Sequence, residues 1–220
     1  MARALRLAHR GDWRVAPENS LAAMRAALAI DHCDGLEFDV RGSREGIPIL
    51  LHDDTLDRVQ GRPGRPGELS IDELAAAGIP TLAEVLAVAG PRPFLDVELK
   101  GEPVAAVIPV LEAARAPGLA RTVVSSFEAE TLRWVGLRRP GWPRWLNTDD
   151  LSERTVDLAV DLGCRGLSVD WRAIDPAGMT RAAAAGLEVA AWTVRRRSTV
   201  ARLERLGVMA LCVEAAALDG

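Results

Sequence analysis

The fold is decided by the segment GLEFDVR, residues 35–41, in which acidic residues stand between apolar ones. Successive residues of a β-strand point to opposite faces, so Glu37 and Asp39 share one face of the predicted strand. Carboxylates inside an apolar run such as Leu36–Val40 are not typical of ordinary surface charges. The segment therefore predicts a buried strand that carries a polar site at its C-terminal end.

Similar short apolar runs recur along the chain and alternate with longer helical patterns rich in Ala and Leu. The predicted strands are Leu5–Arg10, Gly35–Arg41, Pro93–Lys100, Thr122–Phe127, Arg144–Thr148, Gly166–Trp171, Leu187–Val194 and Val208–Glu214. The predicted helices are Ser20–Asp31, Pro103–Arg115, Glu128–Arg138, Ser152–Leu162, Asp175–Ala185 and Ser198–Leu206.

Eight strands with helical crossovers, in a chain of 220 residues, predict an α/β fold of the TIM (β/α)8 barrel type. We interpret residues 1–220 as one domain. The main alternative is an open doubly wound sheet, which usually carries a glycine-rich phosphate loop after its first strand. The segment Arg10-Gly11-Asp12 is not such a loop, so the barrel is favoured.

One stretch interrupts the alternation. After the second strand the chain turns at residues 44–46, runs extended through Ile47–His52, passes the Gly- and Pro-rich segment Gly61–Gly67 and forms a short helix around Ile71–Ala77. We predict a short insertion after the second strand, at residues 55–80, above the mouth of the barrel. A plain connector is the favoured interpretation of Gly61–Gly67, and a lid is the alternative.

Composition limits the possible partners. The net charge is -4, which gives no basic footprint for nucleic acid. A bound cation could still supply positive charge for a phosphate-bearing substrate. The sequence has no signal peptide and no apolar run long enough to span a membrane, so we expect a cytoplasmic enzyme without a membrane span. Cys33, Cys164 and Cys212 are far apart in apolar segments and are expected to be reduced thiols.

A second acidic strand completes the candidate site. Glu98 and Lys100 share a face at the end of Pro93–Lys100, as Glu37 and Asp39 do at the end of the preceding strand. Active sites of TIM barrels lie at this rim, so the four charged side chains should converge. Three oxygen ligands without cysteine favour Ca²⁺ or Mg²⁺ over zinc.

Two histidines, His9 and His52, each close an extended segment beside these carboxylates, which points to acid–base catalysis. Arg10 could bind a phosphate through two hydrogen bonds. Trp192 lies near the end of a strand and could form a pocket wall, although a core role remains open. The third histidine, His32, is expected to cap the end of the first helix.

These residues fall into motifs that resemble the glycerophosphodiester phosphodiesterase family over nearly the whole chain. The matching segments are His9-Arg10-Gly11, Pro17-Glu18-Asn19-Ser20, Leu36–Val40, His52–Arg58, Ile79–Leu86, Val97–Lys100, Ser125-Ser126-Phe127 and Trp192-Thr193-Val194. The chain departs from the family pattern at Val59, Arg195, Met209 and Glu214, and we expect these departures to affect outer contacts of the substrate.

The resemblance implies a TIM barrel with a small insertion and one divalent cation, Mg²⁺ or Ca²⁺ with Mn²⁺ as a further option. It assigns functions to individual positions as follows: Glu37, Asp39 and Glu98 bind the metal, His9 and His52 act as general acid and base, Arg10 and Lys100 contact phosphate, and Glu18 and Asn19 shape the mouth.

The implied reaction is hydrolysis of a small glycerophosphodiester to sn-glycerol 3-phosphate and an alcohol, by a monomer or homodimer. One alternative keeps the site but acts on single-chain lysophospholipids, as a lysophospholipase D does. Another alternative is a barrel that binds phosphoesters without catalysis, which the intact pair His9 and His52 argues against.

Overall fold

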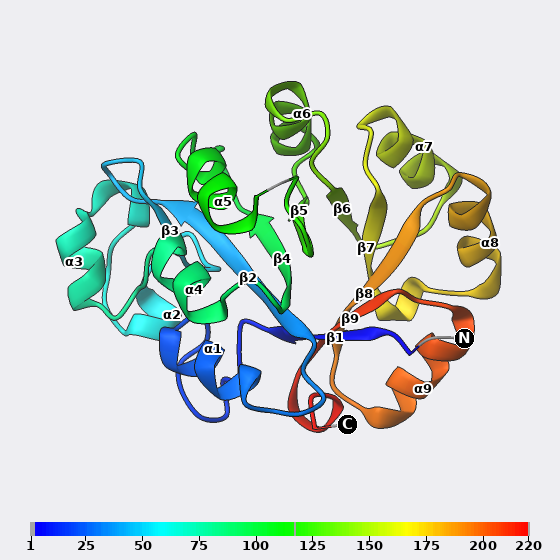
Figure 1. Ribbon diagram of the computed structural model, residues 1–220, viewed down its shortest axis with the longest axis horizontal. Coiled ribbons are helices and arrows are strands. Elements are labelled where there is room, and N and C mark those ends of the chain that lie inside the picture. The colour runs from blue at the N-terminus through cyan, green and yellow to red at the C-terminus, as the bar shows by residue number, and fades with distance from the viewer. Residues whose placement is uncertain (1–2, 117, 220) are drawn as a thin grey trace.

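The computed structural model describes residues 3–116 and 118–219 as a closed barrel of eight parallel strands with helices outside (Figure 1). The barrel strands are β1 (Leu5–His9), β2 (Gly35–Gly42), β4 (Phe94–Leu99), β5 (Thr122–Ser126), β6 (Arg144–Thr148), β7 (Gly166–Asp170), β8 (Glu188–Val194) and β9 (Ala210–Val213). β1 pairs in parallel with both β2 and β9, which closes the barrel. The predicted TIM barrel is confirmed.

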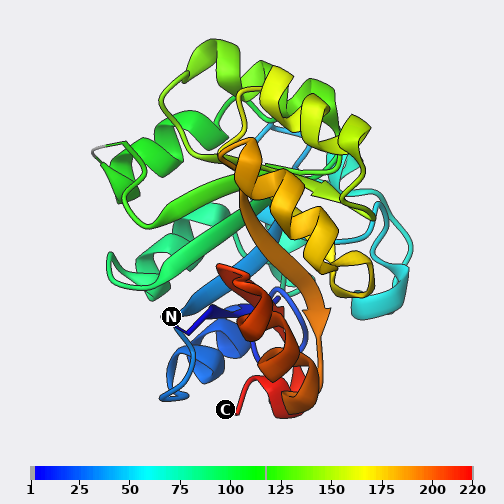
Figure 2. The ribbon, with the colours of Figure 1, turned by 90° about the vertical axis from the view of Figure 1, so that its right-hand side faces the viewer.

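Helices follow the strands and pack on the outer surface. They are α1 (Leu21–Leu28), α4 (Leu82–Ala89), α5 (Val107–Arg115), α6 (Ala129–Arg138), α7 (Glu153–Asp161), α8 (Pro176–Ala184) and α9 (Arg197–Leu206). In Figure 2, α8 and α9 lie on the outer side of the barrel with β8 between them. None of the helices in the described ranges is both long and apolar enough to cross a membrane.

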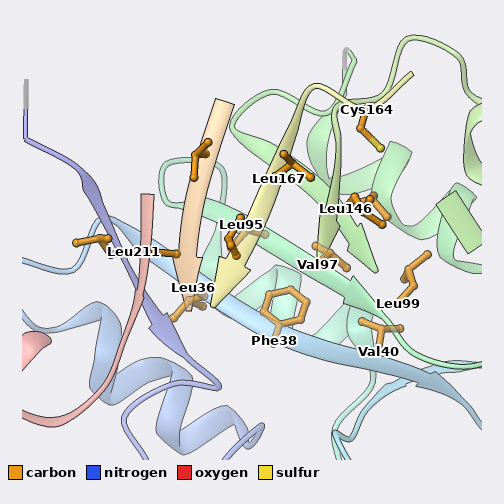
Figure 3. Packing of buried hydrophobic residues seen from close by; sticks show 14 of the residues in the cluster. Leu36, Phe38, Val40, Leu95, Val97, Leu99, Leu146, Cys164, Leu167 and Leu211 are labelled. Atoms are coloured by element: carbon orange, nitrogen blue, oxygen red, sulfur yellow. The ribbon is translucent and has the colours of Figure 1, made fainter. Parts of the chain in front are cut away.

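The two faces of β2 have opposite chemistry, as the alternation in residues 35–41 predicts. Leu36, Phe38 and Val40 are buried among apolar side chains outside the barrel, next to Leu95 and Val97 of β4 (Figure 3). The intervening residues Glu37 and Asp39 face inward, and the parallel register sets them beside Asp96 and Glu98 respectively. Burial of the apolar face therefore forces the carboxylates into the barrel interior.

Apolar side chains fill the barrel interior on the N-terminal side of the polar residues of its strands. Phe94 and Trp145 stack there with their ring centroids 5.9 Å apart. The buried residues of this plug are Leu7, Val123, Trp145, Ala190 and Ala210. Most of the plug residues lie two positions before a polar residue of the same strand, as Trp145 precedes Asn147, so polar side chains occupy the layer above. The plug therefore leaves the polar layer at the C-terminal end of the strands.

The insertion has a small core of its own. It contains β3 (Pro48–Leu50), α2 (Asp57–Gln60), the 3-10 helix η1 (Pro66–Glu68) and α3 (Ile71–Ala76). β3 pairs antiparallel with the end of β2, at the left of Figure 1. Its buried side chains form a separate cluster, Ile49, Leu51, Leu56, Leu74 and Ile79. The insertion is thus packed against the side of the mouth where β2 ends.

Two local predictions were incomplete or wrong. The helix α4 was not predicted, although Thr81 and Glu84 form a capping box at its start. His32 does not cap the first helix, because that helix ends at Leu28 with Ala29 as its C-cap and His32 is exposed in the following turn. Cys33, Cys164 and Cys212 are free thiols, as predicted.

Gly11 allows α1 to approach the end of β1. Its φ is +82°, and a Cβ atom placed there would lie 2.7 Å from the carbonyl carbon of Ala23. We expect Gly11→Ala to lower the free energy of unfolding by about 1–2 kcal/mol for the left-handed backbone and by about 1–3 kcal/mol more for the collision.

Gly46→Ala is the matched control for denaturant unfolding. Gly46 has a φ of +72°, but no atom lies within 4 Å of its added Cβ. Equal losses of stability in the two variants would show that the approach of α1 does not constrain Gly11.

Candidate active site

Three carboxylates meet at the C-terminal end of β2 and β4. One oxygen atom from each of Glu37, Asp39 and Glu98 lies within 4.8 Å of the others, and all three residues are buried. Asp39 Oδ1 is buried and accepts no hydrogen bond from the described residues. Lys100 Nζ lies 3.3 Å from this oxygen without forming a hydrogen bond to it, and a buried carboxylate oxygen that accepts no hydrogen bond is costly unless cations neutralise it. Oxygen donors are those that Ca²⁺ and Mg²⁺ prefer, so the residues present fit a divalent cation.

The carboxylates repel one another in this buried setting. Burial raises the pKa of Glu37 well above its usual range, and the charges of Asp39 and Glu98 raise it further. Burial and the charge of Asp39 raise the pKa of Glu98 to about 7. Burial would also raise the pKa of Asp39, but the charges of Arg10 and Lys100 outweigh that effect and lower it. A divalent cation would favour the charged form of all three.

Two cationic side chains balance part of this charge. Arg10 Nε lies 3.1 Å from Asp39 Oδ2, and Lys100 Nζ lies 3.3 Å from Asp39 Oδ1 and 2.5 Å from Glu98 Oε1. Asn19 Nδ2 donates to Asp39 Oδ2 at 2.9 Å. Asp39 is therefore the centre on which the cations and the amide converge.

The loop after β1 reaches the site through two left-handed residues. Arg10 has a φ of 59° and Asn19 a φ of 58°. Arg10 N donates to Glu37 O at 2.8 Å, and Asn19 N donates to Arg10 O at 2.9 Å. A left-handed arginine is strained, and such strain persists where surrounding contacts require it. These backbone bonds hold the Arg10 and Asn19 side chains over Asp39.

His9 stands between two carboxylates. Its Nε2 atom lies 3.8 Å from Glu37 Oε2, and its Nδ1 atom lies 2.5 Å from Glu214 Oε1. Arg195 Nε donates to Glu214 Oε2 at 2.6 Å. Burial raises the pKa of Glu214, but its bonds to His9 and Arg195 outweigh this and lower the pKa to about 2. Glu214 is thus a carboxylate that accepts the Nδ1 proton of His9.

His52 has a similar environment, built from the insertion. Its Nδ1 atom lies 2.6 Å from Asp53 Oδ1, and Arg58 Nε donates to Asp53 Oδ2 at 2.6 Å. Arg58 also bonds both oxygens of Glu18, which in turn accepts from Arg10 at 2.9 Å. The bond from Arg58 lowers the pKa of Asp53 to about 2, and burial lowers the pKa of His52. Glu18 and Arg58 thereby connect the insertion to the carboxylate site.

A cavity of about 170 Å³ opens beside these groups. Phe127 and Trp192 form one wall, with their rings edge to face and centroids 5.5 Å apart. Among the described residues that line it are His9, Arg10, Glu37, His52, Asp96, Glu98, Lys100, Asn147, Ser168 and Cys212. The cavity therefore has charged groups on one side and an apolar wall on another.

The structure brings the predicted site residues to one place. His9, Arg10, Glu37, His52, Glu98, Lys100 and Trp192 line the cavity, Asp39 lies beside them, and Glu18 and Asn19 bond to Arg10 or Asp39. Asp96 also lines the cavity, and it accepts a hydrogen bond from Ser125 Oγ at 2.6 Å.

The sequence did not assign a role at the site to Arg58 or Phe127. It placed Glu214 among the outer contacts of the substrate, whereas Glu214 bonds His9 directly. A signal for Glu214 was its position directly after an apolar strand, the same position that marks His52 after Ile47–Leu51.

The geometry agrees with comparison to known proteins. A family model described as the glycerophosphoryl diester phosphodiesterase family matches residues 9–218. The chain belongs to this family. Its relatives are phosphodiesterases, so this member of the glycerophosphoryl diester phosphodiesterase family is an enzyme of the hydrolase class, as the sequence predicted.

Individual relatives match different shares of this family member. A glycerophosphodiester phosphodiesterase of Caldanaerobacter subterraneus is 27% identical over 222 residues, which cover 92% of this chain and 90% of that protein. Human glycerophosphodiester phosphodiesterase 1 is 43% identical over 68 residues, which cover 31% of this chain and 20% of the human protein.

Solved structures support the same fold. An Oleispira antarctica phosphodiesterase in complex with the product sn-glycerol-3-phosphate matches with a TM-score of 0.85 and 27% identity, covering 96% of this chain and 93% of that one. A Thermotoga maritima glycerophosphodiester phosphodiesterase matches with a TM-score of 0.82 and 20% identity, covering 100% and 97%. The second match supports the fold alone.

Cation binding should depend on pH with a defined sign. Glu98 has an ordinary pKa of 4.5 and a folded pKa of about 7, so between these values the folded protein keeps a proton that the unfolded chain has lost. Without divalent cations, the free energy of unfolding should therefore fall as the pH rises from about 4.5 to about 7. A divalent cation must displace that proton, so its affinity should rise over the same range.

Calorimetric titration with Ca²⁺ and Mg²⁺ in two buffers of different ionisation enthalpy measures both the affinity and the protons released. Glu98→Gln is the control, because it keeps the shape of the side chain but has no proton to lose. Affinity that stays constant between about pH 6 and about pH 8 would contradict the proposed ligand set.

Proposed function

We propose that the protein hydrolyses glycerophosphodiesters to sn-glycerol 3-phosphate and an alcohol, with a divalent cation and two histidines. The observation that carries this proposal is the placement of His9 and His52 on one small cavity with three buried carboxylates, Arg10 and Lys100. Binding alone would need the charges, but it would not need two imidazoles with carboxylate partners. The product-bound Oleispira antarctica relative supports the substrate class.

Glu37, Asp39 and Glu98 would hold the cation. Mg²⁺ and Ca²⁺ fit the all-oxygen set, and Mn²⁺ is compatible with it. When bound, the cation supplies Lewis acidity that offsets the negative charge of the phosphodiester.

Arg10 and Lys100 bind the phosphoryl group. Both line the cavity, and they approach opposite oxygens of Asp39, so their positive charges border the place where the phosphodiester enters. Negative charge builds on the phosphoryl oxygens as the ester bond breaks. Cations that are already oriented stabilise that charge without further reorganisation.

The histidines move the protons. The Nδ1 atom of each ring bonds an ionised carboxylate, Glu214 for His9 and Asp53 for His52. Each ring is thereby held with Nε2 as the atom that exchanges a proton with substrate. One histidine takes the proton of the nucleophile, either water or the substrate's own 2-hydroxyl, and the other protonates the leaving alkoxide.

The aromatic wall packs against the carbon skeleton of the substrate. Trp192 is fixed by a bond from its Nε1 to Ser168 O at 2.9 Å, and Phe127 packs edge to face against it. Aromatic rings bury the apolar face of a small alcohol while the charged groups hold its phosphate.

A second candidate is a lysophospholipase D type of activity on single-chain lysophospholipids. Phe127 favours it, because this wall residue is 43% exposed and would offer apolar surface to an acyl chain at the mouth. Turnover of glycerophosphocholine compared with lysophosphatidylcholine, with EDTA and metal add-back, separates the two substrates. Activity that is indifferent to EDTA would overturn the proposed role of the cation.

Replacing either histidine should abolish most of the activity. We expect His9→Ala and His52→Ala each to lower kcat on glycerophosphocholine by about 10²–10⁴-fold, because a proton acceptor or donor is lost. Release of choline measures the rate. Calorimetric binding of sn-glycerol 3-phosphate should persist in both variants.

His32→Ala is the matched control, since His32 is exposed in the turn before β2 and outside the cavity. Near-normal rates in both His9→Ala and His52→Ala would refute the mechanism. Binding of glycerophosphocholine without turnover in Mg²⁺, Ca²⁺ or Mn²⁺ would instead support a non-catalytic barrel.

The cytoplasmic location, the monomeric or homodimeric state and the reading of the chain as one domain stay predictions from sequence.

A further inference from the structure

The support for His9 extends beyond Glu214 to the surface. Glu214 is 6% exposed, and its two carboxylate oxygens have different partners. Oε1 accepts the Nδ1 proton of His9 at 2.5 Å, and Oε2 accepts the Nε proton of Arg195 at 2.6 Å. Both oxygens of a buried carboxylate are thus bonded, and its plane is fixed from two sides.

Arg195 is well placed to act on Glu214. It directly follows β8, whose last residue Val194 accepts a hydrogen bond from Glu214 N at 2.9 Å. The ends of β8 and β9 are therefore joined by a backbone bond and, one residue further on, by the ion pair. The Arg195 side chain is 67% exposed, so it contributes little apolar burial.

Loss of Arg195 would free one side of the carboxylate. Glu214 could then turn about its last side-chain bond, because only His9 would still hold it. An imidazole whose partner turns is no longer fixed with Nε2 toward the cavity, and a misplacement of about 1 Å can cost about a hundredfold in rate.

We propose that Arg195 is a positioning residue, which acts through Glu214 to hold the imidazole of His9 with Nε2 facing the cavity. The proposal rests on the proposed function, since it gives His9 a part in proton transfer. It assigns a catalytic effect to an exposed arginine that contacts neither the carboxylate site nor the cavity.

A purely structural role makes a different prediction. Exposed ion pairs contribute little to the free energy of unfolding. The pair Arg165–Glu188 provides the comparison, because its N···O distance is also 2.6 Å and Arg165 is 57% exposed. It lies at the opposite end of the barrel, at the start of β7 and β8. If both arginines are only structural, kcat should stay normal when either one is replaced.

The experiment compares Arg195→Met with Arg165→Met in the full chain. We expect Arg195→Met to lower kcat on glycerophosphocholine by on the order of tenfold to a hundredfold, with KM changed by less than about twofold because phosphate-binding groups are untouched. Arg165→Met should keep the normal kcat. Arg195→Lys should recover part of the loss, since lysine restores the charge without the planar guanidinium.

A second measurement does not depend on turnover. Nitrogen-15 NMR of the His9 ring reports which nitrogen carries the proton. Wild-type protein should show a proton fixed on Nδ1, and both Arg195→Met and Glu214→Gln should show a mixture of tautomers.

Unchanged kcat in Arg195→Met, or an equal loss in Arg165→Met, would overturn the proposal, as would an unchanged tautomer of His9. His9→Ala serves as the reference in the same assay. If His9→Ala retains activity, the proposed function fails, whereas an inactive His9→Ala beside a fully active Arg195→Met removes only the role of Arg195.

Discussion

Repulsion among three buried carboxylates is the constraint that the other side chains at the mouth of the barrel offset. Glu37, Asp39 and Glu98 lie within 4.8 Å of one another inside the barrel, where burial disfavours their charged forms. Arg10 and Lys100 offset part of this cost at Asp39. Arg10 has a left-handed backbone where its guanidinium reaches Asp39. A divalent cation would relieve this repulsion by favouring the charged form of all three carboxylates.

The apolar packing that stabilises the barrel and the charged groups of the site lie at different levels along the barrel axis. Its lower interior is filled by a plug of apolar side chains around Trp145, and its outer faces are packed against helices through residues such as Phe38. This packing holds the strand ends rigidly, so charged groups at the mouth keep their positions although their mutual contacts are unfavourable. The same division accounts for a cavity whose described lining residues include charged groups of the mouth.

Each histidine is held by a carboxylate that an arginine binds in turn, but the two carboxylate–arginine pairs come from different parts of the chain. His52 is held by Asp53 and Arg58, which belong to the insertion and its entry, whereas His9 is held by Glu214 and Arg195 from the last strands. In both cases a carboxylate accepts the Nδ1 proton and an arginine bonds its second oxygen. The insertion therefore serves the site through Arg58 and Glu18, by ion pairs that reach Arg10.

The sequence by itself determined the barrel, the inward carboxylates and the two histidines, because each follows from a local pattern. Alternation with a period of two fixes which residues of β2 and β4 face inward, and strand ends mark the mouth. The helix α4 was not predicted, because it follows an insertion that interrupts the alternation of strands and helices. Only the tertiary structure could pair His9 with Glu214, since 205 residues separate them. Closure of β9 against β1 brings them together, and no local pattern carries that contact.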